Sequence, residues 1–413
     1  MIGYVRLNSE TVQQATDPGT APVSGRHVFR LAPQLALPEI GIGMLGYGFM
    51  GRAHANAYRT IPATFSSAAA RPRLVALCGR TEEAAAAAAA RYGFAGYFTD
   101  WRDLVADGRV QILDNCAWHD AHAEPCIAAA ALGKHVLCEK PLALSAPEAR
   151  RMRDAVLRSG VTNMVCFNYR FAPAIRLARE IIVSGRLGAL HHIRISYLQE
   201  HQADPAKPYP WAGRQSGALL GLGSHVIDLA RFLIGEPRTV TGYVRTFNQR
   251  RPHPDGSGRM VDVLDDDTTL AQVEFVNGAL GTLEASWACA GRKNQLSLEI
   301  NGAQGSLAWD LEDLNRLHVA LPPQQQDDGV AGFTNVLVTE AEHQYHQAWW
   351  PAGHIMGWEH LHVNAIQHFL QAVGTGTGVA PWGATFEDGY RASVVSDAIT
   401  EASETGRRIA IRY

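Results

Sequence analysis

Features that would place a chain in a special class are scarce in this sequence. Its 413 residues include six cysteines, and these are scattered with no C-x-x-C pair. This pattern argues against a disulfide framework or a structural zinc site and favours a reducing compartment, so we expect a cytoplasmic protein. No stretch approaches the roughly 20 apolar residues of a membrane helix. The N-terminus lacks the basic start and apolar block of a signal peptide.

An excess of either charge is also missing. The chain has 37 Lys and Arg against 40 Asp and Glu, a net charge of −3, and no long basic run. Nucleic-acid binding proteins usually carry a basic face, and anionic membranes attract basic segments. We therefore expect neither partner.

What the sequence does contain is an alternation of strands and helices. Apolar strand-like stretches lie at 40–45, 73–78, 110–116 and 134–139, with helical segments between them at 49–59, 82–92 and 121–132. The second helical segment contains seven consecutive alanines, the residue of highest helix propensity. Alternation of this kind is typical of a parallel sheet with helices on both faces. It predicts an α/β Rossmann-like domain over residues 38–165.

The pattern changes after about residue 165. Segments with period 2 lie at 268–275, 279–288, 294–301 and 305–311. Such alternation predicts an antiparallel sheet with one buried face. We expect an α+β domain at 166–413 with an open, mostly antiparallel sheet, and C-terminal helices at about 385–405 that pack back toward the first domain. Residues 1–37 lack periodicity and are interpreted as an N-terminal arm that crosses to another subunit.

The strongest single motif is G-x-G-x-x-G at Gly46, Gly48 and Gly51, between a predicted strand and a predicted helix. The first glycine allows the tight turn, the second lets the backbone approach a pyrophosphate, and the third lets the helix pack on the strand. The free N–H groups of the helix then meet the phosphates. With Phe49 and Met50, these glycines are the predicted phosphate side of a dinucleotide site.

The end of the second strand bears on the choice between NAD and NADP. A carboxylate there commonly binds the ribose hydroxyl of NAD. This chain has Gly79 and Arg80 instead, and an arginine can pair with the 2′-phosphate of NADP. The pattern slightly favours NADP, whereas NAD remains possible if Arg80 only caps or solvates the next helix.

A third motif is the charged pair Glu139–Lys140 followed by Pro141, at the end of an apolar strand. A strand-end lysine is usually a surface residue or an ion-pair partner. The carboxyl edge of a parallel sheet is, however, where such folds bind ligands. A lysine beside a nicotinamide could exchange a proton with a carbinol oxygen.

Several stretches together resemble the glucose–fructose oxidoreductase and inositol dehydrogenase (Gfo/Idh/MocA) family over roughly 40–410. They are IGMLGYGFMGRAHANAY, GKHVLCEKPLALS, NYRFAPAIRLA, GLGSHVIDLARFLIGE, VLDDDTTLAQVEFVNGALGTLEAS and TFEDGYRASVVSDAITEASETGRRI. The resemblance implies hydride transfer to or from a secondary hydroxyl of a sugar, cyclic polyol or glycoside. It also implies a homo-oligomer, a dimer or tetramer, formed through the open sheet, and a proline after the lysine that can be cis.

The same resemblance implies the roles of individual residues. Lys140 and His225 would be catalytic, since a histidine titrates near neutral pH and can take a hydroxyl proton. The nicotinamide side would be formed by Trp118, His119, His122, Glu139 and Lys140. The substrate would be contacted by Lys140, Tyr169, Arg170, Trp211, His225, Trp350 and His354. We expect no metal, although the histidine pairs His343-x-x-His346 and His360-x-His362 occur, because no carboxylate or thiolate recurs at ligand spacing.

One departure from the family pattern affects the mechanism. Many dehydrogenases of the family carry an aspartate four residues before the histidine, where this chain has Gly221. Either Lys140 and His225 suffice, or another side chain takes the place of that aspartate, with Glu200, His201 and Arg214 as candidates by proximity in sequence.

Two alternatives to a dehydrogenase follow. The first is a redox-neutral enzyme that cleaves or isomerises glycosides with a tightly bound, internally recycled NAD(H). The second is a non-catalytic NADP-binding regulator, against which the intact Lys140 and His225 argue.

Overall fold

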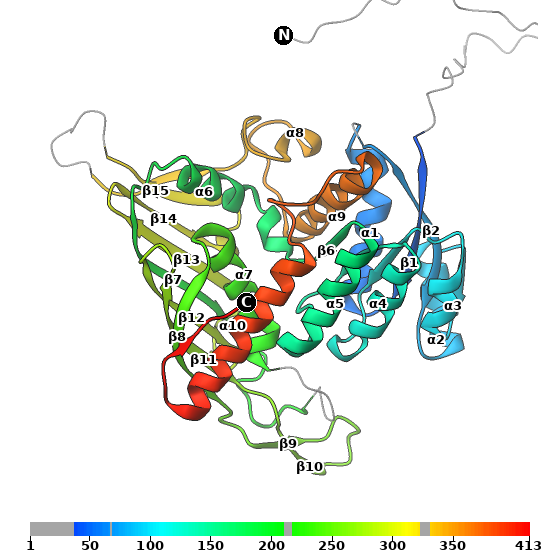
Figure 1. The fold of residues 1–413 in the computed structure, drawn as a ribbon, viewed down its shortest axis with the longest axis horizontal. Helices are drawn as coiled ribbons and strands as arrows, with labels where there is room; N and C mark the ends of the chain where they lie inside the picture. The colour runs from blue at the N-terminus through cyan, green and yellow to red at the C-terminus, as the bar shows by residue number, and fades with distance from the viewer. Residues whose placement is uncertain (1–36, 67, 210–216, 323–330) are drawn as a thin grey trace, which may run out of the picture. The chain divides into compact units, whose positions relative to one another are not determined.

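The computed structural model of the chain describes residues 37–66, 68–209, 217–322 and 331–413 (Figure 1). The proposed arm up to residue 36, Trp211 and Arg214 lie outside this range. Among the described residues, none of the helices combines the length and apolar character needed to cross a membrane.

The first sheet has six parallel strands in the order β3-β2-β1-β4-β5-β6. The strands are β1 (Glu39–Leu45), β2 (Arg71–Cys78), β3 (Gly96–Phe98), β4 (Ile112–Asn115), β5 (His135–Cys138) and β6 (Asn163–Val165). They are connected by α1 (Phe49–Thr64), α2 (Glu82–Tyr92), α3 (Trp101–Ala106), α4 (Ala123–Ala131) and α5 (Ala146–Ser159). The strand order reverses between β1 and β4, which is where doubly wound sheets bind ligands. The predicted Rossmann fold is confirmed.

The second sheet has nine strands in the order β16-β15-β14-β13-β7-β12-β11-β8-β17, on the left of Figure 1. Its strands are β7 (Leu190–Leu198), β8 (Pro237–Arg245), β11 (Thr268–Phe275), β12 (Leu280–Ser286), β13 (Gln295–Gly302), β14 (Gly305–Asp310), β15 (Arg316–Ala320), β16 (Thr334–Leu337) and β17 (Ile409–Ala410). Only β7 and β12 pair in parallel, so the sheet is mostly antiparallel, as predicted. A separate hairpin joins β9 (Arg250–Pro252) to β10 (Met260–Asp262).

Helices cover one face of the second sheet because its strands alternate. In β11 the side chains of Thr269, Ala271, Val273 and Phe275 are buried, and those between them are at least partly exposed. The helices that contact this sheet are α6 (Pro173–Val183), α7 (Ser224–Leu233) and α10 (Phe386–Thr405). Helix α9 (Trp358–Thr375), which follows the short α8 (His346–Trp349), packs on α1 of the first domain instead. A π-helical turn, Leu219–Gly223, leads directly into α7.

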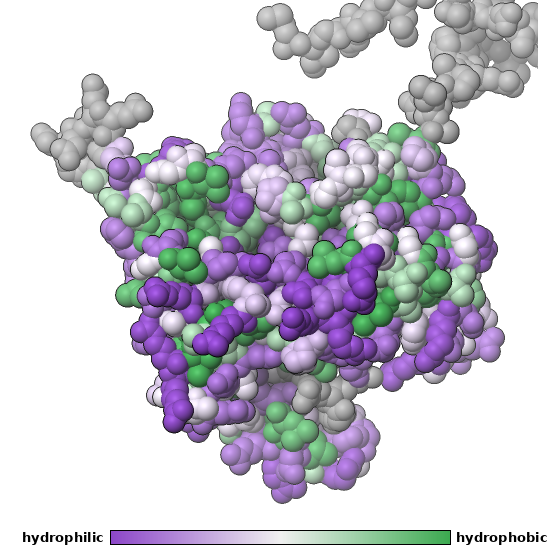
Figure 2. All heavy atoms as spheres, in the orientation of Figure 1, coloured by the Kyte–Doolittle hydropathy of each residue, from purple (hydrophilic) through white to green (hydrophobic). Residues whose placement is uncertain are grey.

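Helix α10 contacts both sheets, and Figure 1 shows it running between them. On one side the N–H of Phe386 donates to Asn163 Oδ1 (2.8 Å), and the N–H of Ala146, at the start of α5, donates to Asp397 Oδ2 (2.9 Å). On the other side the N–H of Val244 in β8 donates to Ser403 Oγ (2.8 Å). In Figure 2 hydrophilic residues gather over the ridge where α10 runs.

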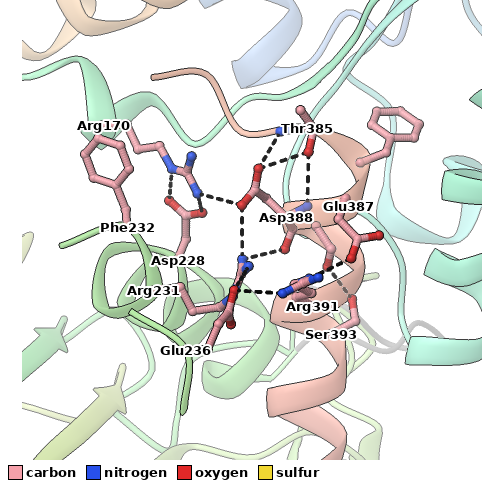
Figure 3. A network of polar contacts seen from close by, with 12 residues as sticks. Arg170, Asp228, Arg231, Phe232, Glu236, Thr385, Glu387, Asp388, Arg391 and Ser393 are labelled. Carbon is pink, nitrogen blue, oxygen red and sulfur yellow. Dashed lines mark hydrogen bonds and ion pairs between the residues drawn. The ribbon is translucent and has the colours of Figure 1, made fainter. Parts of the chain in front are cut away.

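A buried ion network fixes α7 against α10 (Figure 3). Arg170 donates to both carboxylate oxygens of Asp228, at 2.8 and 2.6 Å, and both side chains are buried. Asp388 lies 3.5 Å from Arg170 and 3.4 Å from Arg231. Thr385 and Asp388 cap the start of α10 reciprocally. Removing one member of such a buried pair leaves an unpaired charge and costs about 3–5 kcal/mol, so the network holds α7 in one position.

Candidate active site

A cavity of about 1090 Å³ lies between the two sheets. On one side it is lined by residues at the carboxyl ends of β1, β2, β4 and β5, among them Leu45, Cys78, Cys116 and Glu139. On the other side it is lined by residues that follow β7 and β12, by the π-helical turn with α7, and by the start of α9. The cavity therefore occupies the place expected for a ligand in a doubly wound sheet.

The glycine loop at one end of the cavity has the shape of a phosphate cradle. Gly46 has φ +92°, and a Cβ there would lie 2.8 Å from the backbone of Cys116 and Ala117. A Cβ on Gly51 would lie 2.3 Å from the carbonyl oxygen of Gly46, so α1 packs too closely for a side chain. A Cβ on Gly48 would meet nothing within 4 Å among the described residues. Open space over Gly48 and the free N–H groups at the start of α1 fit the pyrophosphate of a dinucleotide.

The end of β2 forms the next part of the cavity wall. The ring of Tyr47 covers Gly79 so closely that a Cβ on Gly79 would lie 1.9 Å from Tyr47 Cε1. Arg80 is exposed and lines the cavity. Among the described lining residues the only carboxylates are Asp120 and Glu139, so none stands at the end of β2.

Lys140 projects from the turn after β5 into the middle of the cavity. Its Nζ donates to the carbonyl oxygen of Gly221 (2.9 Å), and its backbone N–H donates to Glu139 Oε2 (3.1 Å). Burial lowers the pKa of Lys140 below its ordinary value, although the nearby Glu139 and Cys166 act in the opposite direction. The Lys140–Pro141 peptide bond is cis, as the resemblance implied.

His225 lies in the first turn of α7 and lines the same cavity. Its Nδ1 is buried and has no hydrogen-bond partner in the described part of the chain. Its ring packs against Tyr169, with a centroid distance of 4.6 Å. Burial first, and then the charge of Lys140, lower the pKa of His225 well below the usual value. The imidazole is therefore neutral at physiological pH and can accept or pass on a hydroxyl proton.

A row of opposite charges lies behind Lys140. His54 in α1 is fully buried, with Nδ1 3.0 Å from each carboxylate oxygen of Asp114 and Nε2 3.0 Å from Glu139 Oε1. Burial alone would lower the pKa of His54, but Asp114 and the thiols of Cys116 and Cys166 raise it well above the usual value. Burial alone would raise the pKa of Glu139, but the hydrogen bond and charge of His54 lower it to about 2.

These groups also include the side chains of the site that could act as metal ligands. His54 belongs to both sets of three ligand-type side chains found close together in the described residues, one with Glu139 and His362 and one with Asp114 and Cys116. Direct hydrogen bonds to the two carboxylates already engage both nitrogens of His54.

A row of uncharged polar groups forms the opposite wall. The hydroxyls of Tyr169 and Tyr197 are 2.8 Å apart, and Trp358 Nε1 donates to Tyr169 (3.3 Å). Tyr197 then donates to Asn294 Oδ1 (2.7 Å), which also accepts from Gln199 Nε2 (2.6 Å). We call Tyr169, Tyr197, Gln199 and Asn294 the polar row. Its groups can hold several hydroxyls of a neutral substrate at fixed positions.

Most residues predicted for the site do line the cavity. They are Gly46, Gly48, Phe49, Met50, Gly79, Arg80, Trp118, His119, Glu139, Lys140, Tyr169 and His225. His201, one of the substitutes considered for the missing aspartate, also lines it, whereas Glu200 pairs with Lys293 at the surface. Trp211 and Arg214 lie outside the described residues.

Five predicted site residues are not among the described residues that line the cavity. One is Gly51, which packs on the carbonyl of Gly46 instead. His122 is buried beneath the cavity, with Nδ1 3.0 Å from the carbonyl oxygen of Pro141 and Nε2 3.2 Å from that of Ala117. Arg170 is held by Asp228 in the ion network. Trp350 is 49% exposed, and His354 Nδ1 lies 2.8 Å from the carbonyl oxygen of Pro351. Trp358 and His362 are the residues of the Trp- and His-rich segment 345–362 that line the cavity.

Sequence reasoning missed Tyr197, Gln199, Asn294 and Trp287. Gln199 follows β7, and Asn294 precedes β13, which pairs with β7 in antiparallel register. Both therefore lie at the same edge of the sheet. A polar residue at the end of each strand could have indicated them, but only if the pairing of the strands had been known.

Comparison with known proteins agrees with this geometry. Residues 40–167 match the model of an oxidoreductase family with an NAD-binding Rossmann fold, and residues 175–308 match the GFO/IDH/MocA C-terminal domain. The chain is 36% identical to a levoglucosan dehydrogenase of Pseudarthrobacter phenanthrenivorans, over 89% of this chain and 97% of that protein. The chain belongs to the GFO/IDH/MocA family. The chain is also 26% identical to an inositol 2-dehydrogenase of Rhizobium meliloti, over 90% of this chain and 99% of that protein.

Solved structures give the same result. A levoglucosan dehydrogenase in complex with NADH and L-sorbose superposes with a TM-score of 0.86 at 35% identity, covering 91% of this chain and 99% of that one. An oxidoreductase domain protein from Kribbella flavida has a TM-score of 0.86 at 40% identity, with 91% and 100% coverage. The chain is therefore an oxidoreductase with an NAD-binding Rossmann domain.

The buried charges of His54, Asp114 and Glu139 predict that His54 contributes to the stability of the fold in a pH-dependent way. The raised pKa of His54 stabilises the fold fully below pH 6.5, and this contribution is lost as the pH rises through the raised value. The lowered pKa of Glu139 contributes to the stability of the fold above pH 4.5, and this contribution is lost as the pH falls toward about 2. His54→Gln should therefore lower the free energy of unfolding by about 3–5 kcal/mol near pH 6, and by less at alkaline pH.

Urea unfolding of both proteins over a pH series checks this. The matched control is His253→Gln, whose pair with Asp255 lies at the surface, and whose effect should stay below about 1 kcal/mol. A loss for His54→Gln that grows toward alkaline pH would contradict the assignment of a charged imidazole.

Proposed function

We propose that the enzyme oxidises a neutral, compact sugar of the anhydrosugar type, with Lys140 as the base that takes the hydroxyl proton. The observation that carries the proposal is the position of Lys140 Nζ, which is held by the Gly221 carbonyl in the cavity that also contains the glycine loop and the polar row. The printed name of the relative at 36% identity, levoglucosan dehydrogenase, supports this substrate class over the inositols of relatives near 26%.

The residues present fit a nicotinamide dinucleotide. Gly46, Gly48 and the N–H groups at the start of α1 would hold its pyrophosphate, and Arg80 would lie at its adenosine end. When bound, the nicotinamide supplies the hydride acceptor. Lys140, with its pKa lowered by burial, is more often neutral than an exposed lysine, so it can accept the proton of the reacting hydroxyl.

The other residues orient the sugar. The neutral imidazole of His225 and the polar row offer both donors and acceptors, which suits hydroxyl groups on several carbons of one ring. Glu139 does not compete for the proton, because its pKa of about 2 keeps it ionised and paired with His54.

The proposal extends to the oligomeric state, the cellular compartment and the domain division of the enzyme. The face of the second sheet opposite its helices bears exposed apolar side chains such as Tyr243, Leu270 and Leu280, which supports a homo-oligomer formed through this sheet. All six cysteines are described and free, which supports a reducing, cytoplasmic setting. We keep the division into an arm at 1–37, an NAD(P)-binding domain at 38–165 and a substrate domain at 166–413.

Lys140→Met tests the base. Loss of a positioned acid/base group should lower kcat by a factor of about 10²–10⁴, with dinucleotide binding retained. NADH or NADPH formation is followed by absorbance with levoglucosan, inositols and free aldoses as substrates. The matched control is Lys207→Met, an exposed lysine outside the cavity, which should keep its activity.

Three results would count against this proposal. Unchanged turnover of Lys140→Met would remove the role of the lysine. A wild-type enzyme that reduces its cofactor with inositols but not with anhydrosugars would overturn the substrate class. Substrate conversion without net cofactor reduction would instead favour the redox-neutral alternative.

Arg80 is proposed to set the preference for NADP over NAD. Its guanidinium at the end of β2 supports a contact with a 2′-phosphate, while the NADH complexes concern the related enzymes. Arg80→Ala should lower kcat/KM for NADP⁺ about tenfold or more, as expected for a charge-assisted hydrogen bond, and change kcat/KM for NAD⁺ much less. The control is Arg91→Ala, on the exposed side of α2. Equal losses with both cofactors would refute this role.

A further inference from the structure

Gly221 and Trp287 are in unusually close contact inside the cavity. A Cβ built on Gly221 would lie 2.8 Å from Cζ3 and 3.1 Å from Cη2 of Trp287. Gly221 does not have the positive φ that would itself require glycine. The indole therefore occupies the space that a side chain at position 221 would need.

The indole is held in that space by its surroundings. Trp287 follows β12 directly and is 4% exposed. Its backbone N–H donates to the carbonyl of Asp267 (3.2 Å), and its own carbonyl accepts from the N–H of Gln202 (2.9 Å). Its ring meets His201 edge to face, with centroids 4.8 Å apart. The two hydrogen bonds fix the backbone of Trp287, and movement of the indole away from Gly221 would disturb its ring contact with His201.

Gly221 also holds Lys140. Its carbonyl oxygen, in the π-helical turn before α7, accepts the hydrogen bond from Lys140 Nζ. π-helical turns are frequent at functional sites. The same residue therefore supplies the acceptor of the lysine and leaves the space that the indole occupies.

Few charged side chains line the cavity in the described part of the chain, namely Arg80, Asp120, Glu139 and Lys140. Of the two carboxylates among its described lining residues, Glu139 is engaged by His54, and Asp120 comes from the loop after β4. The only arginine among those residues is Arg80, at the end of β2. The polar row is neutral. The described residues of the polar row therefore offer hydrogen bonds to a neutral sugar and no arginine to a sugar acid or sugar nucleotide.

We propose that Trp287 is the specificity-determining residue of the site, that its indole packs against the apolar C–H surface of a neutral sugar ring, and that Gly221 lacks a side chain so that the indole can take this position. The inference rests on the proposed function, whose base and substrate class it extends. An indole offers a large rigid apolar surface, and the polar row faces the hydroxyls of the same ring.

Trp287→Ala tests the packing surface. KM for the neutral anhydrosugar should rise about two- to tenfold, as expected for the loss of one aromatic packing contact, while kcat falls much less. Calorimetric titration of the NADH-loaded protein with the sugar supplies a second readout that needs no turnover. The control is Trp350→Phe, an exposed tryptophan outside the cavity, which should leave KM unchanged.

Gly221→Ala tests the contact itself. The added Cβ should displace the indole and raise KM for the sugar, and Trp287→Phe in the same chain should partly reverse this, because phenylalanine lacks the outer ring atoms that clash. Gly378→Ala is the matched control, because its Cβ would meet nothing within 4 Å of described structure and its φ is not positive. Thermal unfolding confirms that each variant is folded.

The outcomes separate this inference from the proposed function. A wild type that oxidises the sugar while Trp287→Ala keeps its KM and binding constant would overturn the role of Trp287 alone. Additive effects of Gly221→Ala and Trp287→Phe, with no reversal, would overturn the pairing. A wild type without activity on neutral sugars, but with binding of one that Trp287→Ala abolishes, would support the inference and count against the proposed function.

Discussion

The amino group of Lys140, half-buried in the cavity, is the group on which the rest of the site depends. A cation taken out of water needs acceptors and opposite charge. The carbonyl of Gly221 supplies the acceptor, and Glu139 supplies the charge. Glu139 is in turn balanced by the imidazolium of His54, and His54 by Asp114. Charges of alternating sign thus extend from the cavity into the parallel sheet, and each is stable only because the next is present.

The two sheets contribute different chemistry to one cavity. The parallel sheet brings the glycine loop and Lys140 to the carboxyl ends of its strands, where the dinucleotide fits. The antiparallel sheet contributes the neutral polar row and the indole of Trp287. The ion network of Arg170, Asp228 and Asp388 fixes α7 between them, so that the carbonyl of Gly221 and the ring of His225 keep their positions relative to Lys140.

Local sequence patterns predicted the regular elements well, because the long strands are apolar or alternate and the helices are amphipathic or rich in alanine. Strands β3 and β6 were missed, since three residues are too few to show a period. Strands β8, β15 and β16 of the second sheet were not predicted either. The glycine motif, Lys140 and His225 were found because each stands at a fixed place relative to a strand or helix. Tyr197, Gln199, Asn294 and Trp287 were not, since they come together only through the pairing of distant strands. Arg170 pairs with Asp228, since a charge in a motif can serve an ion pair as well as a substrate.

The pH dependence of cofactor reduction in the first turnover tests the central claim most directly. If neutral Lys140 is the base, the rate should rise with pH and level off at a pKa below the usual lysine value of 10.5, because burial favours the uncharged amine. His225 should add no ionisation in this range, since its pKa lies well below 6.5. Lys140→Met should abolish the rise. A rate that does not change between about pH 6 and pH 10, or a rise that persists in Lys140→Met, would contradict the account.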